Sequence, residues 1–366
     1  MKKREAKFEL LRIVAMLMII TLHYLDKGGI LPKPGAEFSS AGYLAWLLEA
    51  FCVPAVNVYV LISAYFLAGS DYRPMKTAKL WIEVFFYSAG LAALALATGI
   101  VSVAETDKYR LLQYLFPVVE EHYWFVTAYV LMYLLAPLMN ETLRVLSKRT
   151  LEQGIGLLLL FLSLSSSILP VKLPIDRMGY DALWFLCLYL TGAYLRYHTA
   201  LDEDLPGVCL RGFAGYGVCS LLIAGSLAAL HVFYQKTGSL EGFINRQYQY
   251  NSILCLAASV FLFTAFAGLR PGRTEGKGAE LIRRIASASF GVYLIHEHLA
   301  LRYLWPQWLG TQNFADTPAF LLHWLFSVLA VYGVCMLIDL IRQALFWGIG
   351  RIGKSVLSGY LQTQRK

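Results

Sequence analysis

The sequence predicts an all-α polytopic membrane protein with about ten transmembrane helices. Three observations support this fold class. First, 58% of the 366 residues are hydrophobic, only 15% are charged, and the mean hydropathy is +0.55. Second, apolar runs long enough to cross the roughly 30 Å hydrocarbon core of a bilayer recur along almost the whole chain. Third, lysines and arginines gather on alternate connecting segments, as they do in cytoplasmic loops.

We expect ten spans, each built around one apolar run. The first begins close to the N-terminus and has no small-residue cleavage site after it, so we expect it to be retained rather than removed as a signal peptide. The ten spans cover residues 8–26, 42–68, 79–101, 122–139, 153–169, 182–196, 211–232, 251–268, 288–305 and 318–341.

The charge distribution predicts the orientation. With the N-terminus in the cytoplasm, 23 of the 32 lysines and arginines fall on the cytoplasmic side, so both termini are expected there. The net charge of +8 follows from this bias, and no nucleic acid partner is expected. We predict one membrane domain over residues 1–345, with lipids around it, and a basic cytoplasmic tail over residues 346–366 that can lie on the anionic inner leaflet.

The first span carries one arginine and one histidine, Arg12 and His23. They are about three whole helical turns apart, so they share one face and lie roughly 16 Å from each other along the axis. An imidazole inside a span can act as a general base near neutral pH, although it can also be a packing residue bonded to a carbonyl. Arg12 can clamp a phosphate or a carbonyl, or it can extend to the inner membrane surface.

Two carboxylates can orient these side chains. Glu9 precedes Arg12 by one turn and can pair with it. Asp26 follows His23 by three residues and can orient the imidazole ring, although a solvated position at the outer helix end explains it equally well.

The second span contains polar residues and ends beside two cations. Asn57, Ser63 and Tyr65 lie in an otherwise apolar run, and Arg73 and Lys76 follow at its inner end. A pair of cations at the cytosolic surface suits a phosphorylated co-substrate. The alternative is the ordinary excess of positive charge on cytoplasmic loops.

Further polar and aromatic residues are expected near the outer face. Tyr123 and Trp124 open the fourth span, where they suit carbohydrate stacking or an interfacial aromatic belt. His296 and Glu297 lie late in the ninth span, and ionisable residues inside spans are candidates for function. The His-Glu-His run lacks the i, i+4 spacing of a helical zinc site, so no metal site is predicted.

Taken together, these residues resemble the acyltransferase 3 family, whose members are integral membrane O-acyltransferases that acetylate cell-surface glycans. The resemblance spans nearly the whole chain in order, and the chain is most similar to short bacterial members without an appended extracellular domain. It is carried by the pair Arg12 and His23, ISAYFL at 62–67, HYWFVTAYVLMYLLAPLMN at 122–140, GYDALWFLCLYLTGAYLR at 179–196 and SFGVYLIHEH at 289–298.

Two motifs depart from the family pattern. The family's Ser-Gly-aromatic is Ser63-Ala64-Tyr65 here, and its Arg-x-x-Arg ends in lysine, from Arg73 to Lys76. Lysine keeps the charge but loses the bidentate fork of arginine. A phosphate contact is therefore retained, whereas the detailed role of Lys76 differs from that of an arginine.

The resemblance implies a reaction and its substrates. Acyl-CoA, usually acetyl-CoA, would be the cytosolic co-substrate, with no tightly bound cofactor, and the acceptor would be a hydroxyl of an extracytoplasmic glycan or lipid-linked sugar. The location would be the bacterial plasma (inner) membrane. His23 would be the general base or a transient acyl carrier, and Arg12 would position the thioester. The expected CoA-binding residues are Arg12, Arg73, Lys76, Ser63 and Tyr65, and the expected acceptor-binding residues are Asn57, Tyr123, Trp124, His296 and Glu297.

Two functions of other classes remain as alternatives. One is a transporter or flippase for a surface-glycan precursor, but the sequence shows no internal repeat and no pair of broken helices. The other is a non-catalytic membrane module that delivers or senses a ligand.

Overall fold

The computed structural model describes residues 4–33, 39–118, 122–169, 175, 177–199, 201, 207–269 and 276–363. Helices and turns make up this part of the chain, and it contains no strand. The helices of the first half are α1 (Ala6–Asp26), α2 (Ser40–Cys52), α3 (Ala55–Leu67), α4 (Pro74–Ala97), η1 (Val103–Glu105), α5 (Lys108–Leu115), α6 (Trp124–Val145), α7 (Lys148–Leu159), the π-helical turn η2 (Leu160–Leu164) and α8 (Ser165–Ile168). Those of the second half are α9 (Ala182–His198), α10 (Val208–Thr237), α11 (Glu241–Ile244), α12 (Ile253–Ala267), α13 (Lys277–Ser287), α14 (Ser289–His296), α15 (Leu304–Trp308), η4 (Thr311–Phe314) and α16 (Phe320–Thr363).

Within the described residues, seven helical segments are long and apolar enough to cross a membrane. The predicted count of ten is therefore not confirmed. The other three predicted spans correspond to the helices α9, α12 and α14, which are shorter, with 17, 15 and 8 residues. The seven segments are Ala6–Asp26, Ser40–Leu67, Pro74–Ala97, Trp124–Val145, Lys148–Ile168, Val208–Thr237 and Phe320–Arg351.

The ninth predicted span, 288–305, is wrong as a single helix. Helix α14 ends at His296, and the chain then turns before α15. The polar residues that follow are bonded to other parts of the molecule, Glu297 to Lys27 and His298 to the backbone carbonyl of Ser88. At the other end of the chain, α16 continues without a break across the predicted domain boundary after residue 345.

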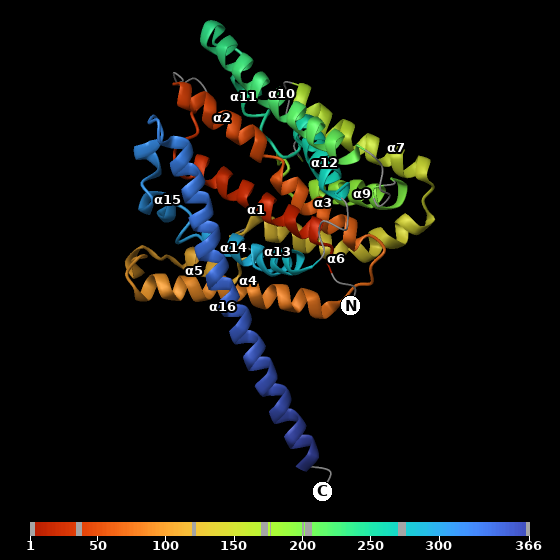
Figure 1. Ribbon diagram of the computed structural model, residues 1–366, viewed down its shortest axis with the longest axis vertical. Helices are drawn as coiled ribbons and strands as arrows, with labels where there is room; N and C mark the ends of the chain where they lie inside the picture. The colour runs from red at the N-terminus through yellow and green to blue at the C-terminus, as the bar shows by residue number, and fades with distance from the viewer. Residues whose placement is uncertain are drawn as a thin grey trace.

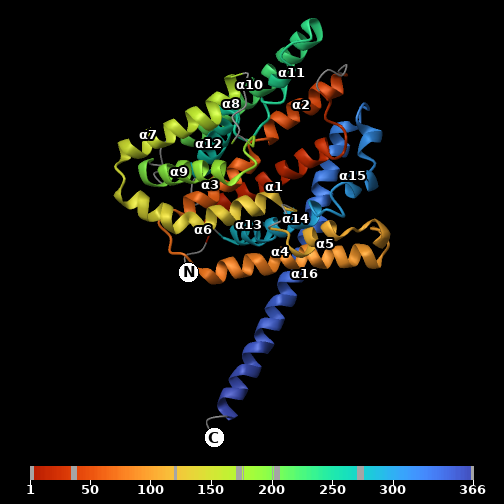
Figure 2. The ribbon, with the colours of Figure 1, turned by 180° about the vertical axis from the view of Figure 1, so that it is seen from behind.

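Helix α1 lies at the centre of the bundle. It packs against α2, α3, α12, α13, α14 and α16, and both views show it enclosed by them (Figure 1, Figure 2). Leu11, Ala15, Ile20 and Leu25 of α1 are completely buried. A helix that is apolar on nearly every side is suited to such an internal position, so its polar side chains are placed inside the protein.

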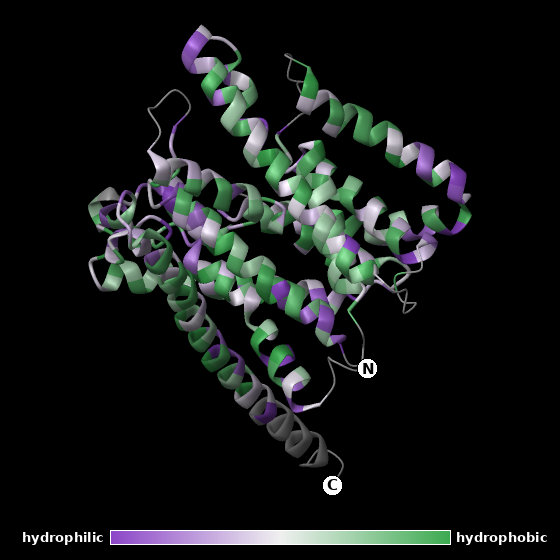
Figure 3. Cartoon of the chain, turned by 45° about the horizontal axis from the view of Figure 1, so that its top comes forward, coloured by the Kyte–Doolittle hydropathy of each residue, from purple (hydrophilic) through white to green (hydrophobic). Residues whose placement is uncertain are grey.

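The outward faces of the bundle are apolar. Helix α16 exposes Leu322, Phe326 and Ile341, and α4 exposes Ile82 and Leu94. Apolar residues predominate along the coloured part of α16 (Figure 3). Exposed apolar surface of this extent is not tolerated by a soluble monomer, but it matches the hydrocarbon of a lipid bilayer.

A buried ionic network joins α4 to α16. Arg342 donates from Nε to Asp339 at 2.8 Å and from Nη2 to Glu83 at 2.8 Å, and the Tyr87 hydroxyl donates to Asp339 at 2.7 Å. Gly291 of α14 packs directly on this network, since a Cβ there would lie 2.2 Å from an Asp339 carboxylate oxygen. The absence of a side chain at Gly291 thus allows α14 to approach α16 closely.

Candidate functional site

Arg12 and His23 lie at two different polar centres along α1. Arg12 lines a cavity of about 640 Å³ near the start of the helix. His23 contacts His296 and Glu297 near its end. We call the first the Arg12 cavity and the second, formed by His23, His296 and Glu297, the His23 cluster.

The Arg12 cavity carries more cations than carboxylates. Side chains from α1, α3, α4, α6 and α9 line it, among them Ser63 and Tyr65. Its volume falls in the usual range of small-molecule sites, and its excess of positive charge favours an anionic occupant. The charged residues lining it are the cations Arg4, Arg12, Lys76, Lys79 and Arg196 and the carboxylates Glu5, Glu9 and Glu83.

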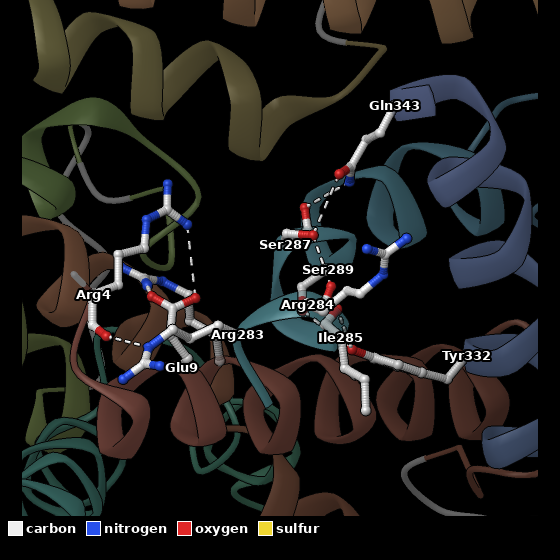
Figure 4. A network of polar contacts seen from close by, with 10 residues as sticks. Arg4, Glu9, Arg283, Arg284, Ile285, Ser287, Ser289, Tyr332 and Gln343 are labelled. Carbon is white, nitrogen blue, oxygen red and sulfur yellow. Dashed lines mark hydrogen bonds and ion pairs between the residues drawn. The ribbon is translucent and has the colours of Figure 1, made fainter. Parts of the chain in front are cut away.

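Glu9 anchors Arg12 within this cavity. The Glu9 side chain is almost fully buried, and it accepts a hydrogen bond from Nη1 of Arg12. Arg4 lies 3.7 Å from the other Glu9 oxygen, and Arg283 donates to the Arg4 carbonyl at 2.7 Å (Figure 4). The ion pair expected between Glu9 and Arg12 is therefore present, and α13 helps to hold it in place.

Of the other residues expected to bind CoA, all but Arg73 line the Arg12 cavity. Ser63, Tyr65 and Lys76 line the cavity, whereas Arg73 is exposed at the N-cap of α4 and is not among its lining residues. Arg196 lines the cavity as well, with its guanidinium 5.3 Å from the centre of the Tyr65 ring. Sequence reasoning did not select Arg196, although an arginine in the last turn of a predicted span was an available signal.

The hydrogen bonds of the His23 cluster determine which ring nitrogen of His296 and of His23 carries the proton. His296 Nδ1 lies 2.6 Å from the Val292 carbonyl, to which only an N–H can donate. In the neutral ring, His296 Nε2 is then an acceptor, and it lies 2.9 Å from His23 Nδ1. Nδ1 of His23 therefore carries the proton, and Nε2 keeps its lone pair. His23 is 17% exposed, and no hydrogen-bond partner of Nε2 occurs among the described residues.

Glu297 connects His23 to two cations. One of its oxygens lies 3.2 Å from His23 Nδ1 and also accepts from Lys27, and the other lies 3.5 Å from Arg302. Burial lowers the pKa of the Lys27 ammonium, and the Glu297 carboxylate opposes this shift. The two cations compensate the buried carboxylate charge, so Glu297 is held in position against His23.

The carboxylate that contacts His23 is therefore not the one nearest in sequence. Asp26 is exposed at the end of α1, whereas Glu297 comes from the turn after α14. Lys27 and Arg302 were not selected from the sequence either. Lys27 directly follows the first predicted span and Arg302 lies within the ninth, and only the fold shows that both reach the same carboxylate.

Asn57 lies in the packed core. It is completely buried, donates from Nδ2 to the Tyr250 carbonyl at 2.7 Å, and accepts from Trp184 Nε1 at 3.0 Å. These bonds join α3 to α9 and to the turn before α12. The arrangement supports a structural role for an amide that the sequence analysis assigned to acceptor binding.

We expect Asn57→Leu to lower the free energy of unfolding by about 1–3 kcal/mol, because it leaves buried hydrogen-bonding groups of Trp184 and Tyr250 without partners. Thermal unfolding of the purified protein in detergent measures this loss. The matched control is Asn313→Leu, since Asn313 is an exposed asparagine. A raised KM for the acceptor with unchanged stability would instead support acceptor binding by Asn57.

The two aromatic residues expected at the acceptor differ in environment. Tyr123 is completely buried, and its hydroxyl donates to the Leu294 carbonyl at 2.8 Å, which ties the start of α6 to α14. Trp124 is only partly buried, with its ring centre 4.5 Å from that of Tyr180. Of the two, Trp124 is therefore the one available to a ligand.

Comparison with known proteins identifies the family. The acyltransferase domain of the acyltransferase 3 family matches residues 5–340. No curated protein and no solved structure matches the chain significantly. The matched segment includes α1, the His23 cluster and every residue lining the Arg12 cavity except Arg4, and it covers far more than half of the 366 residues. The chain therefore belongs to the acyltransferase 3 family of membrane acyltransferases.

Proposed function

We propose that the protein is an O-acyltransferase of the bacterial inner membrane. It moves an acetyl group from cytosolic acetyl-CoA to a hydroxyl of an extracytoplasmic glycan or lipid-linked sugar. One observation carries the proposal: a single central helix connects a cationic cavity at Arg12 to a histidine, His23, whose Nε2 is free to accept a proton.

The Arg12 cavity suits the donor. CoA is a polyanion whose phosphates lie at the opposite end of a flexible arm from its thioester. The cations of the cavity attract the phosphates, and the arm extends along α1 toward His23. Because Arg12 and His23 lie roughly 16 Å apart along the helix, Arg12 positions the thioester by holding CoA and does not touch the reacting carbon.

His23 supplies the base for the transfer step. Its Nε2 takes the proton of the acceptor hydroxyl while the oxygen attacks the thioester carbonyl. The C–S bond then breaks, the acetyl group stays on the oxygen as an ester, and the CoA thiolate recovers the proton from His23. Glu297, 3.2 Å from Nδ1, stabilises the transient imidazolium and keeps Nε2 directed at the hydroxyl.

Reconstitution into vesicles tests the proposed activity. With radiolabelled acetyl-CoA and a glycan acceptor, the protein should form an acetylated sugar ester and release free CoA in equal amount. Movement of sugar across the membrane without acetyl-CoA, and with no ester formed, would contradict the proposal and favour the transporter alternative.

Lys76→Ala should raise the KM for acetyl-CoA about tenfold while changing kcat little, because it removes a charged hydrogen bond to a CoA phosphate. Arg73→Ala should have a smaller effect, because Arg73 does not line the cavity. Initial-rate kinetics at several acetyl-CoA concentrations measure both. Lys148→Ala, which removes an exposed lysine from α7, is the control. Equal KM values for the Lys76 and Lys148 variants would exclude a phosphate contact at Lys76.

A further inference from the structure

A second cavity lies at the end of α1 that is farther from Arg12. Its volume is about 360 Å³. It is lined by Lys27 and Gly28, which follow α1, and by residues of the segment 306–313, which includes the end of α15 and most of η4. Both views show α15 beside this end of α1 (Figure 1, Figure 2). We call it the Lys27 cavity, and none of the residues assigned to the donor lines it.

The lining of the Lys27 cavity is rich in side-chain amides. Gln307, Gln312 and Asn313 contribute them, and the described lining residues include no carboxylate and no aromatic ring. Within the described part of the chain, these three side chains have no hydrogen-bond partner. An amide both donates and accepts, so it can bond to a hydroxyl in either role. The lining therefore suits a polyhydroxylated ligand better than an apolar one.

The end of α1 holds the amide-bearing segment in place. Thr311 is buried, and its hydroxyl donates to the Gly28 carbonyl at 3.2 Å. Gly29 has a φ of +66°, and a Cβ there would lie 2.5 Å from Gln312 Nε2, so the Gln312 amide lies directly against the Gly29 backbone. Glycine adopts this left-handed conformation without strain.

Helix α16 fixes the same segment from another side. The Tyr24 hydroxyl of α1 lies 2.8 Å from His323 Nδ1, and His323 Nε2 lies 2.9 Å from the Leu309 carbonyl. Only an N–H can donate to that carbonyl, so in the neutral ring Nδ1 accepts from Tyr24. This chain of bonds joins α1, α16 and the turn after α15. The amides are thus presented by a segment that two helices hold, which lowers the entropy cost of binding.

Lys27 connects the cavity to the His23 cluster. Its ammonium donates to Glu297, which lies 3.2 Å from His23 Nδ1. The Lys27 backbone N–H donates to the His23 carbonyl at 3.0 Å, so helical geometry continues to Lys27 and the two side chains are neighbours one turn apart. An ammonium carries three N–H groups, so Lys27 can bond to a ligand as well as to Glu297.

The Arg12 and Lys27 cavities lie on opposite sides of His23 along α1. Arg12 precedes His23 by about three helical turns, and Lys27 follows it by about one. A donor held at Arg12 approaches His23 from one direction, which leaves the other direction to a second substrate. The volume of the Lys27 cavity is at the lower end of the range of small-molecule sites, so it suits one sugar ring.

We propose that the Lys27 cavity binds the acceptor as a single polyhydroxylated ring, held by the amides of Gln307 and Gln312. This inference rests on the proposed function, since it assigns the acceptor side of the same reaction. Ring hydroxyls exchange hydrogen bonds with the two amides, and Lys27 donates to a further ring oxygen. Another hydroxyl of the same ring then reaches His23 Nε2, which takes its proton.

Saturation-transfer NMR on the full-length protein in detergent tests the site. The probes are a methyl hexopyranoside and cyclohexylmethanol, which has a ring of the same size but only one hydroxyl. Wild type should bind the hexoside at least about tenfold more tightly, and saturating CoA should not displace it, because CoA occupies the other end of α1. No binding of the hexoside, equal binding of both probes, or displacement by CoA would overturn the inference.

Variants separate ligand binding from a structural role. Gln307→Leu and Gln312→Leu should each weaken hexoside binding about tenfold, because each removes an amide of the cavity. The unfolding temperature should not change, since both side chains are exposed. Gln153→Leu, at an exposed glutamine of α7, is the matched control and should bind as wild type does. Wild-type binding by the Gln307→Leu/Gln312→Leu double variant would refute the site.

Hydrolysis of acetyl-CoA without acceptor distinguishes this inference from the proposed function. Both glutamine variants should hydrolyse acetyl-CoA at the wild-type rate, because their effects are confined to the acceptor. Amide-dependent sugar binding without any His23-dependent turnover of acetyl-CoA would refute the proposed reaction but leave the sugar site standing. Acetyl transfer with an unchanged acceptor KM in the double variant would refute only the site.

Discussion

Acyl transfer by the His23→Ala protein is expected to fall by a factor of about 10²–10⁴, which is the usual contribution of a general base. The variant lacks the Nε2 lone pair that removes the acceptor proton. CoA binding should be unchanged, because His23 does not line the Arg12 cavity. Transfer of radiolabel from acetyl-CoA to the acceptor measures the first effect, and equilibrium binding of CoA measures the second.

Intact-mass measurement distinguishes direct transfer from transfer through an acyl-histidine. If His23 carries the acetyl group, intact-mass measurement of wild type with acetyl-CoA and no acceptor should show a single added acetyl group that hydroxylamine removes. If transfer is direct, no such adduct forms. His23→Gln, which preserves some polarity but no base, should be as inactive as His23→Ala. Wild-type activity in either variant would remove His23 from the mechanism.

Glu297→Gln is expected to lower kcat by about ten- to a hundredfold with little change in the KM for acetyl-CoA. The reason is that the variant positions the His23 ring less firmly and stabilises its imidazolium less. It should also lower the free energy of unfolding by about 3–5 kcal/mol, since Lys27 and Arg302 lose their common carboxylate. Steady-state kinetics and thermal unfolding in detergent measure the two effects.

A double-mutant cycle shows whether Glu297 acts through His23. In the His23→Ala background, Glu297→Gln should cause almost no further loss of kcat, because the residue that it positions is gone. Glu141→Gln is a matched control, since Glu141 is ion-paired with Arg144 but is 67% exposed, and it should change stability by no more than about 0.5 kcal/mol. Additive losses in the cycle would assign Glu297 a role independent of His23.

The geometry of α1 could be predicted from the sequence. A regular helix fixes which residues share a face and how far apart they lie, so the alignment of Arg12 and His23 followed from their spacing. The ion pair between Glu9 and Arg12 was predictable for the same reason, because residues three apart are neighbours on a helix. The all-helical fold with long apolar segments likewise follows from composition and hydropathy.

Contacts between distant segments could not be predicted in this way. Proximity in sequence indicated Asp26 as the carboxylate beside His23, but packing brings Glu297 there. Similarly, Arg73 and Lys76 appeared equivalent as two cations three residues apart, yet only Lys76 faces the Arg12 cavity. Arg73 occupies the N-cap position of α4 with an extended backbone, and this is a local conformation that charge spacing does not encode.

The sequence by itself thus determined the membrane class, the family resemblance, and the placement of Arg12 and His23 on one face of the first helix. The tertiary structure decided what surrounds each of them: a cationic cavity at Arg12, and Glu297 with His296 at His23. It also showed that Asn57 is committed to the core and that Gln307 and Gln312 line one cavity with Lys27. The physical reason is that helical periodicity acts over three or four residues, whereas burial and pairing depend on which helices pack together.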